Sequence, residues 1–246
     1  MAMTATSDTA RLAGKFKYFR TTDVSDALDA LGRQDLTLMD ERVRPLWQGI
    51  RFWGPAVTVR ALPANVRMPV LSPEDAVRSH AIWFAEHGGM KIREAVTPGC
   101  VVVTATGGCG EVGIWGSNNT MEMVTLGAVG VVTDGYCRDT DELILQRTPI
   151  ASRARGRTII PGRCTFTGIN EPVGCGGVLV RSGDIVGCDG DGCIVVPQEL
   201  VHDVIVIAKG ILIDDAHKRR ALYERLGLPA DDTVDAAAME RFYADI

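Results

Sequence analysis

Residues 97–139 read TPGCVVVTATGGCGEVGIWGSNNTMEMVTLGAVGVVTDGYCRD, and the rest of the chain is organised around this stretch. It predicts two buried strands, over 100–105 and 129–133, because short valine-rich runs are bounded there by glycine and polar residues. Each predicted strand ends in a loop rich in glycine and polar groups. Loops held by a rigid scaffold often carry function, so we expect the functional groups at 106–119 and 134–139.

Helices and further strands are predicted on both sides of this stretch. The clearest helix start is Ser72, which is followed by Pro73 and two acids at the positive end of the helix dipole. Asp-Gly steps between apolar runs at 189–192 predict a β-hairpin. The predicted helices span 21–31, 72–87, 141–147, 198 to a break at 227–229, and 234–243, and β-rich text spans 49–62 and 150–197.

Composition describes a folded globular chain and excludes several classes of protein. Hydrophobic residues make up 46% and charged residues 23% of the 246 residues, which argues against disorder. The net charge of −5 gives no electrostatic signal for nucleic acid or for an anionic membrane surface. No apolar run approaches the roughly 20 residues that span a bilayer, and the first residues do not resemble a secretion signal.

The seven cysteines favour a reducing compartment. Their number is odd and no Cys-x-x-Cys is present, so neither a disulfide framework nor a zinc cluster is expected. Several lie in apolar strand text, where cysteine behaves as a small hydrophobic residue. Together with the missing export signal, this predicts a cytoplasmic protein.

The chain reads as one domain with a helical arm. We predict a disordered or frayed start over 1–20, a single catalytic domain over 21–212, and a C-terminal helical arm over 213–246. The arm contains a charged helical segment and then a separate amphipathic one, which are hard to bury against the chain's own core. Packing on a neighbouring subunit and an exposed surface helix are both consistent with this pattern.

Two motifs suggest functions that the surrounding sequence does not support. Gly108-x-Gly110-x-x-Gly113 follows a strand, and Asp134 lies at the end of the next strand, as in dinucleotide-binding folds. However, the third glycine does not open a helix, and the repeated βα units of such a fold are missing upstream. His80 and His87 would share one face of a helix, but two histidines without a third ligand are more often structural.

The adjacent pair Arg138 and Asp139 suggests a different chemistry. Arginine offers a planar fork for a carboxylate, and aspartate can ligate Mg²⁺ or Mn²⁺, which prefer oxygen. The loop over 116–119 leads into a helix, whose free N–H groups suit an anion. Together these groups would hold a 2-oxo acid, with a metal at its keto oxygen to stabilise an enolate. A surface ion pair is the alternative, and the spacing alone favours that alternative.

A family resemblance favours the 2-oxo acid. The segments that carry it are GIWG at 113–116, GAVGVVTDG at 127–135, the Arg138-Asp139 pair, PVGCGG at 172–177, GDIV at 183–186, DGCIVVP at 191–197, TDVSDAL at 22–28 and GPAVTV at 54–59. The chain resembles the class II pyruvate aldolases of the 4-hydroxy-4-methyl-2-oxoglutarate aldolase type, which belong with the regulator of ribonuclease activity A family. The resemblance covers most of the chain, from about 21 to 208.

The resemblance implies a fold, an assembly and a reaction. The fold would be a three-layer β/β/α domain of the swivelling type, here with extra N- and C-terminal helices. Homotrimers or hexamers would form active sites between subunits. The reaction would be cleavage of 4-hydroxy-2-oxo dicarboxylates to pyruvate through a metal-stabilised enolate, with oxaloacetate decarboxylation as a side activity. The net charge given above predicts no nucleic-acid or membrane partner.

Carried over by position, Asp139 would hold Mg²⁺ or Mn²⁺ and Arg138 the pyruvyl group. The pocket would be completed by Gly116, Ser117, Asn118 and Asn119. This chain departs from the family pattern at one position. The aldolases have an acidic residue, then twenty residues, and then the Arg-Asp pair. Counted back from Arg138, the position of that acid is occupied by Ser117. A serine cannot act as a carboxylate base at neutral pH.

Two interpretations follow from the missing acid. A base such as Asp214 or Asp215 from a neighbour's arm could replace it. Alternatively, the chain could be a non-catalytic binding protein of the ribonuclease-regulator type; Ser117 favours this second interpretation, and Asp139 argues against it.

Overall fold

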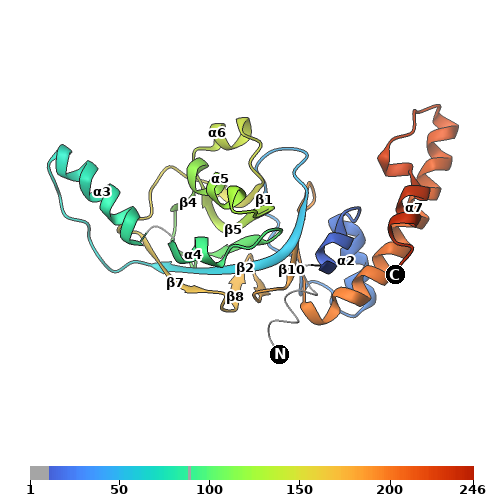
Figure 1. Cartoon of the computed structure of the whole chain (residues 1–246), viewed down its shortest axis with the longest axis horizontal. Helices are drawn as coiled ribbons and strands as arrows, with labels where there is room; N and C mark the ends of the chain where they lie inside the picture. The colour runs from blue at the N-terminus through green and yellow to red at the C-terminus, as the bar shows by residue number, and fades with distance from the viewer. Residues whose placement is uncertain (1–10, 88–89) are drawn as a thin grey trace.

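A mixed sheet of nine strands forms the centre of the computed structural model, which describes residues 11–87 and 90–246 (Figure 1). Its order is β1-β6-β5-β3-β2-β10-β11, with β4 added to β5 and β7 to β2, while β8 and β9 form a separate hairpin. The strands are β1 (Arg44–Pro45), β2 (Phe52–Pro63), β3 (Val101–Ala105), β4 (Gly113–Trp115), β5 (Gly130–Cys137), β6 (Ile150–Arg155), β7 (Cys164–Ile169), β8 (Val173–Cys175), β9 (Val178–Val180), β10 (Ile185–Asp189) and β11 (Gly192–Val196).

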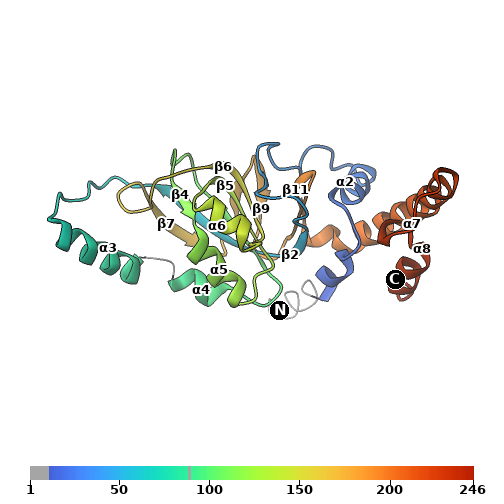
Figure 2. The ribbon, with the colours of Figure 1, turned by 90° about the horizontal axis from the view of Figure 1, so that it is seen from above.

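The middle of the sheet is parallel, and three of its crossovers carry helices. Val102 of β3 lies between Val57 of β2 and Val131 of β5, and Val131 in turn pairs with Ile150 of β6. Helices α4, α5 and α6 lie together on one side of these strands (Figures 1 and 2). The helices are α2 (Thr21–Ala30), α3 (Pro73–His87), α4 (Met90–Ala95), α5 (Ser117–Thr125), α6 (Thr140–Leu145), α7 (Val201–Leu226) and α8 (Ala236–Phe242), with short 3-10 helices η1 (Gly14–Phe16), η2 (Gln198–Leu200) and η3 (Asp232–Val234).

Successive residues of the central strands enter two different cores, because side chains alternate between the faces of a strand. Val102 and Val131 pack under α4, α5 and α6 with Met123 and Leu143. Their neighbours in sequence point the other way. They meet residues of β10, β11 and the β8–β9 hairpin, so the curved sheet encloses a second, barrel-like core. That core includes Ala56, Val101, Val103, Val132, Val173, Val178, Val186 and Val195.

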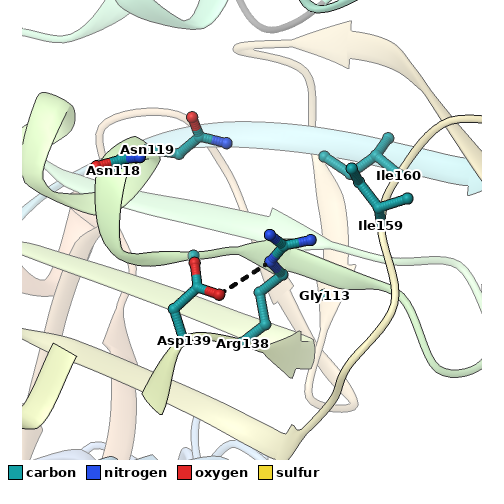
Figure 3. Close-up of a pocket in the computed structure, with 8 residues that line it drawn as sticks. Gly113, Asn118, Asn119, Arg138, Asp139, Ile159 and Ile160 are labelled. Carbon is teal, nitrogen blue, oxygen red and sulfur yellow. Dashed lines mark hydrogen bonds and ion pairs between the residues drawn. The ribbon is translucent and has the colours of Figure 1, made fainter. Parts of the chain in front are cut away.

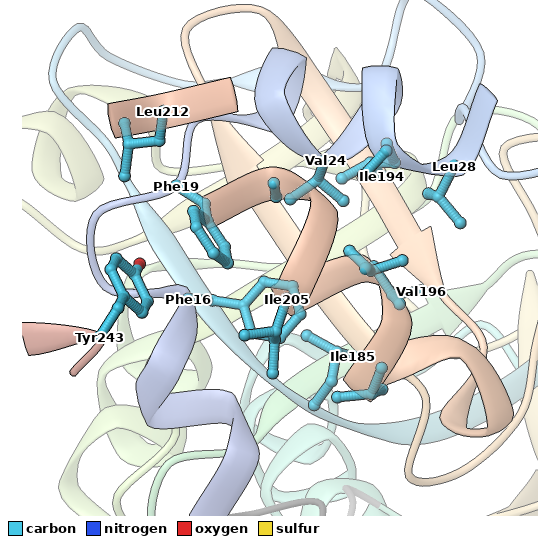
Figure 4. Packing of buried hydrophobic residues seen from close by; sticks show 14 of the residues in the cluster. Phe16, Phe19, Val24, Leu28, Ile185, Ile194, Val196, Ile205, Leu212 and Tyr243 are labelled. Atoms are coloured by element: carbon cyan, nitrogen blue, oxygen red, sulfur yellow. The ribbon is translucent and has the colours of Figure 1, made fainter. Parts of the chain in front are cut away.

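The two ends of the chain build a third core (Figure 4). Phe16 and Phe19 are fully buried there, and the ring of Tyr243 stacks on Phe19 with centroids 5.2 Å apart and planes 7° apart. The Tyr243 hydroxyl donates to the carbonyl of Lys15 over 2.8 Å. The prediction of a frayed start over 1–20 is therefore wrong for 11–20, because three aromatic rings give this segment an apolar surface to bury; residues 1–10 lie outside the described residues.

The predicted arm is continuous with the body of the protein. Helix α7 runs through the predicted boundary at 212 without a break, and α8 folds back on it (Figure 2). Ala216 and Met239 are buried within the chain's own third core. Asp215 also accepts a hydrogen bond from Arg20 over 3.0 Å, which ties α7 to the start of α2.

Helix α3 lies at the opposite end of the molecule from α7 (Figure 1). Its predicted start is confirmed, since the hydroxyl of Ser72 accepts from the backbone N–H of Asp75 over 3.2 Å. His80 and His87, which we expect to be structural rather than metal ligands, have side chains outside the described part of the structure. Among the described helices, none is long and apolar enough to cross a bilayer.

The predicted α/β class and the extra terminal helices are confirmed. The predicted hairpin is β10–β11, which turns at Gly190 and Asp191. All seven cysteines are free thiols, and six of them are buried.

Candidate functional site

A cavity of about 230 Å³ opens where β4 and β5 end (Figure 3). These two strands run parallel, with Gly113 opposite Tyr136 and Trp115 opposite Cys137, so their carboxyl ends meet at one edge. The loop after β4 enters α5, and the loop after β5 enters α6. The cavity is lined by Gly113, Gly116, Asn118, Asn119, Arg138, Asp139, Ile159 and Ile160.

The backbone fixes Arg138 and Asp139 before their side chains make any contact. The N–H of Arg138 donates to the carbonyl of Trp115 over 2.8 Å and so continues the β4–β5 pairing. Asp139 precedes α6 in the left-handed conformation, with φ of 54° and ψ of 43°. Non-glycine residues adopt this conformation uncommonly, although aspartate is enriched among those that do, and such positions cluster at functional sites.

The Asp139 carboxylate joins the two loops. One oxygen, Oδ2, accepts the backbone N–H of Ser117 at the first turn of α5 over 3.1 Å. The other, Oδ1, accepts from Nε of Arg138 over 3.2 Å, and both side chains are one-third exposed. A carboxylate has about four lone-pair directions, so Asp139 keeps acceptor capacity for a ligand in the cavity.

Two glycines make this close packing possible. A Cβ at Gly116 would collide with Oδ2 of Asp139, and a Cβ at Gly113 would lie 2.8 Å from Cδ of Arg138 and from the carbonyl oxygen of Thr158. Neither glycine has a left-handed φ. Their role is therefore to provide space for the two charged side chains.

The structure brings together most of the residues predicted for the site. Gly116, Asn118, Asn119, Arg138 and Asp139 all line the cavity, whereas Ser117 contributes its backbone N–H to the Asp139 carboxylate.

Sequence reasoning missed three further residues that line the cavity. Gly113 was noted only as a motif glycine, although its proximity to the Arg-Asp pair could have been inferred from adjacent parallel strands. Ile159 and Ile160 come from a loop without a functional motif, and no signal in the sequence pointed to them.

The donor set fits a hard cation that is held by a single protein ligand. Among the described residues, no three His, Cys, Asp or Glu side chains form a cluster able to hold a metal ion. Asp139 supplies one carboxylate with acceptor capacity toward the cavity. Mg²⁺ is commonly held by one or two carboxylates and keeps several waters or substrate oxygens. Asp139 therefore fits Mg²⁺ or Mn²⁺ and does not fit a zinc site, which needs three or four protein ligands.

The acids nearest the site in sequence are engaged elsewhere. Glu111 accepts from Arg157 over 2.9 Å, and this partner lowers the pKa of Glu111 to about 2. Glu122 accepts from Nε of Arg93 over 2.7 Å. Neither glutamate lines the cavity, so among the described lining residues Asp139 is the one carboxylate.

The acids of α7 are also paired within the chain. Asp214 accepts from Lys218 over 2.5 Å, and Asp215 accepts from Arg20 over 3.0 Å. Their proposed action in a neighbour's site stays a prediction.

The glycine run is not arranged as a dinucleotide-binding turn. Strand β4, and not a helix, follows Gly110. Asp134, the candidate ribose ligand, accepts hydrogen bonds from the backbone N–H and the hydroxyl of Thr106 over 2.8 and 3.0 Å. The Asp134 side chain therefore ties β5 to the end of β3, and the dinucleotide-binding interpretation has no support in the geometry.

Comparison with known proteins gives one family and several relatives. The profile of the RraA-like family (Aldolase/RraA) matches residues 21–195. A Halalkalibacterium halodurans protein, provisionally named 4-hydroxy-4-methyl-2-oxoglutarate aldolase, is 32% identical over 213 residues, which are 86% of this chain and 89% of that protein. An uncharacterised protein of Methanocaldococcus jannaschii is 30% identical over 134 residues, which cover 53% of this chain and 60% of its own length.

Solved structures share the fold. An uncharacterised protein from Pseudomonas syringae superposes with a TM-score of 0.69 at 25% identity, covering 92% of this chain and 96% of its own. A Streptomyces coelicolor protein, described as an unusual member of the RraA family of ribonuclease inhibitors, gives a TM-score of 0.67 at 22% identity over 87% of this chain and 96% of its own. At that identity the second likeness supports the fold alone.

Proposed function

This chain belongs to the RraA-like family, and we propose that it is a divalent-metal-dependent carbon–carbon lyase that releases pyruvate from a 2-oxo acid. One observation carries the proposal. Arg138 and Asp139 lie side by side on one cavity, locked to the first turn of α5 through the N–H of Ser117 and packed against Gly113 and Gly116. An ordinary surface ion pair would need none of this packing.

The substrate's 2-oxo carboxylate would bind at the charged end of the cavity. Arg138 offers a planar guanidinium, which pairs well with a carboxylate. The first turn of α5 adds N–H groups and the positive end of a helix dipole. Asn118 and Asn119, in that same turn, carry amides that can donate to hydroxyl or keto oxygens. These groups would orient the bond to be broken.

Asp139 would hold Mg²⁺ or Mn²⁺, and the cation would supply Lewis-acid stabilisation of the negative charge that develops on the keto oxygen. For a 4-hydroxy-2-oxo acid, the C3–C4 bond breaks and the C4 hydroxyl loses its proton to become the carbonyl of the second product. The electron pair of the broken bond passes to the pyruvate enolate, which takes up one proton at C3. Arg138 holds the carboxylate throughout.

The test is pyruvate release, coupled to lactate dehydrogenase, from 4-hydroxy-4-methyl-2-oxoglutarate, oxaloacetate and 4-hydroxy-2-oxopentanoate, each with Mg²⁺ and with EDTA. We expect metal-dependent release from at least one of them. Asp139→Asn should abolish it, and asparagine is chosen because it tolerates the left-handed backbone at this position. The matched control is Asp141→Asn, two residues later and exposed, which should keep the activity. Equal loss in both variants, or full activity of Asp139→Asn, would refute the assignment.

A second candidate is a non-catalytic binding protein of the ribonuclease-regulator type. It is favoured by Ser117, which stands where the aldolases have an acid and leaves Asp139 as the one carboxylate among the described lining residues. Absence of pyruvate from all three compounds, together with a tight protein partner, would support it.

The remaining parts of the proposal concern assembly and fold type. We propose a cytoplasmic homotrimer or hexamer, which light scattering coupled to size-exclusion chromatography would test. The three-layer swivelling description is supported by the β8–β9 hairpin, which packs on the opposite face of the sheet from α4, α5 and α6.

A further inference from the structure

Two thiols face each other across the β10–β11 hairpin. Cys188 of β10 pairs directly with Cys193 of β11 in the antiparallel register. The Cys193 thiol donates a hydrogen bond to the sulfur of Cys188, and the two sulfur atoms are 2.9 Å apart. In the described sheets, no other strand pairing places two cysteines directly opposite each other. The pair belongs to one chain, so its geometry does not depend on how subunits assemble.

The register of the hairpin suits a covalent bridge between these thiols. Directly opposite residues of antiparallel strands have Cα atoms about 4.5 or 5.5 Å apart, according to the type of pair. Disulfides form where the two Cα atoms are about 4.4–6.8 Å apart. Either type of pair therefore brings the sulfurs of Cys188 and Cys193 within bonding reach by rotation of the side chains, without a shift of the strands.

The proposed lyase chemistry uses neither thiol. Both side chains belong to the second, barrel-like core, where Cys188 is fully buried and Cys193 nearly so. Among the described residues, no three His, Cys, Asp or Glu side chains are placed to hold a metal ion. The pair is therefore no part of a three-ligand metal site in the described structure, and the reaction open to two adjacent thiols is oxidation to a disulfide.

One of the two thiols can be reached by a small molecule. Cys193 lines a second cavity, of about 260 Å³, together with Thr21, Asp40 and Asp191. Cys188 is not among the described residues that line this cavity, and its exposed fraction is 0%. A reagent close to water in size therefore meets Cys193 before Cys188.

We propose that Cys188 and Cys193 are an oxidation site, which closes an intramolecular disulfide across the β10–β11 hairpin when the protein meets hydrogen peroxide. The Cys193 sulfur attacks one peroxide oxygen, the O–O bond breaks, and a water leaves with the thiol proton, which gives a sulfenic acid. The Cys188 sulfur then attacks the Cys193 sulfur, the S–O bond breaks, and a second water leaves. Both thiols are oxidised, and one peroxide is reduced to two waters.

The first step should be slow at neutral pH. Burial raises the pKa of Cys193 well above its ordinary value, and the hydrogen-bonded Cys188 thiol raises it further, as do the nearby Cys175 and Asp189. The thiolate is the form that attacks, so the rate should still be rising when the pH passes about 9, the ordinary pKa of a thiol. The bridge therefore accumulates under sustained exposure to peroxide.

The bridge would lie beside a turn that holds another element. Asp189, between Cys188 and the turn, accepts the backbone N–H and the hydroxyl of Thr21 over 2.8 and 2.7 Å, which fixes the start of α2. A disulfide at this place joins strands that are already paired, and it restricts the unfolded chain. The oxidised protein should therefore keep its fold and be at least as resistant to urea as the reduced protein.

The test is peroxide treatment of the native full-length protein, followed by alkylation of the remaining thiols in guanidinium, digestion and mass spectrometry. We expect the peptide with Cys188 and Cys193 to lose two hydrogens and to resist alkylation until dithiothreitol is added. Cys188→Ala should leave a sulfenic acid on Cys193 that dimedone traps, and Cys193→Ala should leave Cys188 reduced. The matched control is Cys100→Ala, an equally buried thiol outside the pair, which should keep the bridge.

Three results would overturn the proposal, and the wild-type protein alone can give each of them. The first is full alkylation of both Cys188 and Cys193 after peroxide treatment of the native protein. The second is a bridge from Cys193 to Cys175, the third thiol of the same core. The third is a Cys188–Cys193 bridge that forms only in urea or with loss of the circular dichroism of the native fold. None of these results depends on pyruvate release.

Discussion

Gly116 has no side chain, and the Asp139 carboxylate fills the space that a methyl group would take. The same holds for Gly113 and the aliphatic part of Arg138. The charged pair is thus placed by two missing methyl groups, by one backbone N–H from Ser117, and by a left-handed backbone at Asp139. Each of these constraints acts on a single residue, so single substitutions can test them.

Gly116→Ala should displace Asp139 while preserving every charged group. We expect kcat/KM for pyruvate release to fall by about 100-fold, as a shift near 1 Å can cost that much, with a stability loss of about 1–3 kcal/mol from overpacking. Gly174→Ala is the control, because nothing lies within 4 Å of a Cβ there. The coupled assay gives kcat/KM, and urea unfolding gives the change in stability. An unchanged kcat/KM in Gly116→Ala would mean that activity does not depend on the observed position of the Asp139 carboxylate.

The cysteine thiols should react slowly, and the rise of their reaction rate should be shifted to higher pH. Desolvation raises the pKa of Cys109, the one half-buried cysteine, and raises that of Cys164 to about 12. The thiolate is the reactive form, and a raised pKa means less thiolate at any given pH. Reaction with 5,5′-dithiobis(2-nitrobenzoate) should therefore be slow at pH 8, and its rate should still be rising when the pH passes about 9, the ordinary pKa of a thiol.

Rates measured from pH 7 to 10 on the native protein, with Cys109→Ser as the control, check this expectation. We expect Cys109→Ser to remove the fastest phase. Rapid modification of several thiols at pH 7.5 would contradict the burial of the other six.

Helix α7 shows how one amino acid has opposite effects within one element. Gly210 lies exposed in its interior with nothing within 4 Å of an added Cβ, whereas Gly227 ends the helix with a left-handed φ of 66°. Gly210 costs conformational entropy on folding although its helical backbone does not require glycine. Gly227 adopts a left-handed conformation that is unfavourable for alanine.

Gly210→Ala should therefore stabilise the protein by about 0.5–1 kcal/mol, and Gly227→Ala should destabilise it by about 1 kcal/mol or more. Urea denaturation followed by circular dichroism distinguishes the two signs. A destabilising Gly210→Ala would indicate that α7 contacts something else at that position.

At the scale of the whole molecule, the N-terminal segment and the C-terminal helices depend on each other. Tyr243 is fully buried, stacks on Phe19 and donates to the carbonyl of Lys15. Tyr243→Ala should cost about 3–5 kcal/mol, as for other buried aromatic truncations, while Tyr243→Phe should cost about 1 kcal/mol for the hydrogen bond alone. Urea unfolding measures both changes in the free energy of unfolding. A loss below about 1 kcal/mol in Tyr243→Ala would mean that Tyr243, at the end of α8, is not packed in this core in solution.

How much the sequence could predict also depends on scale. The helix beginning at Ser72 and the hairpin at 189–192 rest on local capping and turn chemistry, and both are present. The cavity residues on the β4–α5 and β5–α6 loops followed from the polar ends of strands and from a family motif. Ile159 and Ile160 could not be found, because their approach to Arg138 depends on a loop whose path is set by tertiary packing.

The burial of 11–20 was missed for a related reason. Its partners lie at the far end of the chain, and local periodicity contains no information about contacts across such a separation. In the sequence, Phe16 and Phe19 are isolated aromatic residues without a periodic pattern. Their packing partners include residues of α7 and α8.

The closure of this third core also has a consequence for synthesis. Lys15 and Tyr243 are separated by 228 positions, and a ribosome adds about 5–20 residues each second. Phe16 and Phe19 are therefore synthesised roughly 10–45 s before their last partner, Tyr243. During that interval the newborn chain carries an uncovered aromatic patch, which makes this segment a natural client for the chaperones that bind apolar nascent chains.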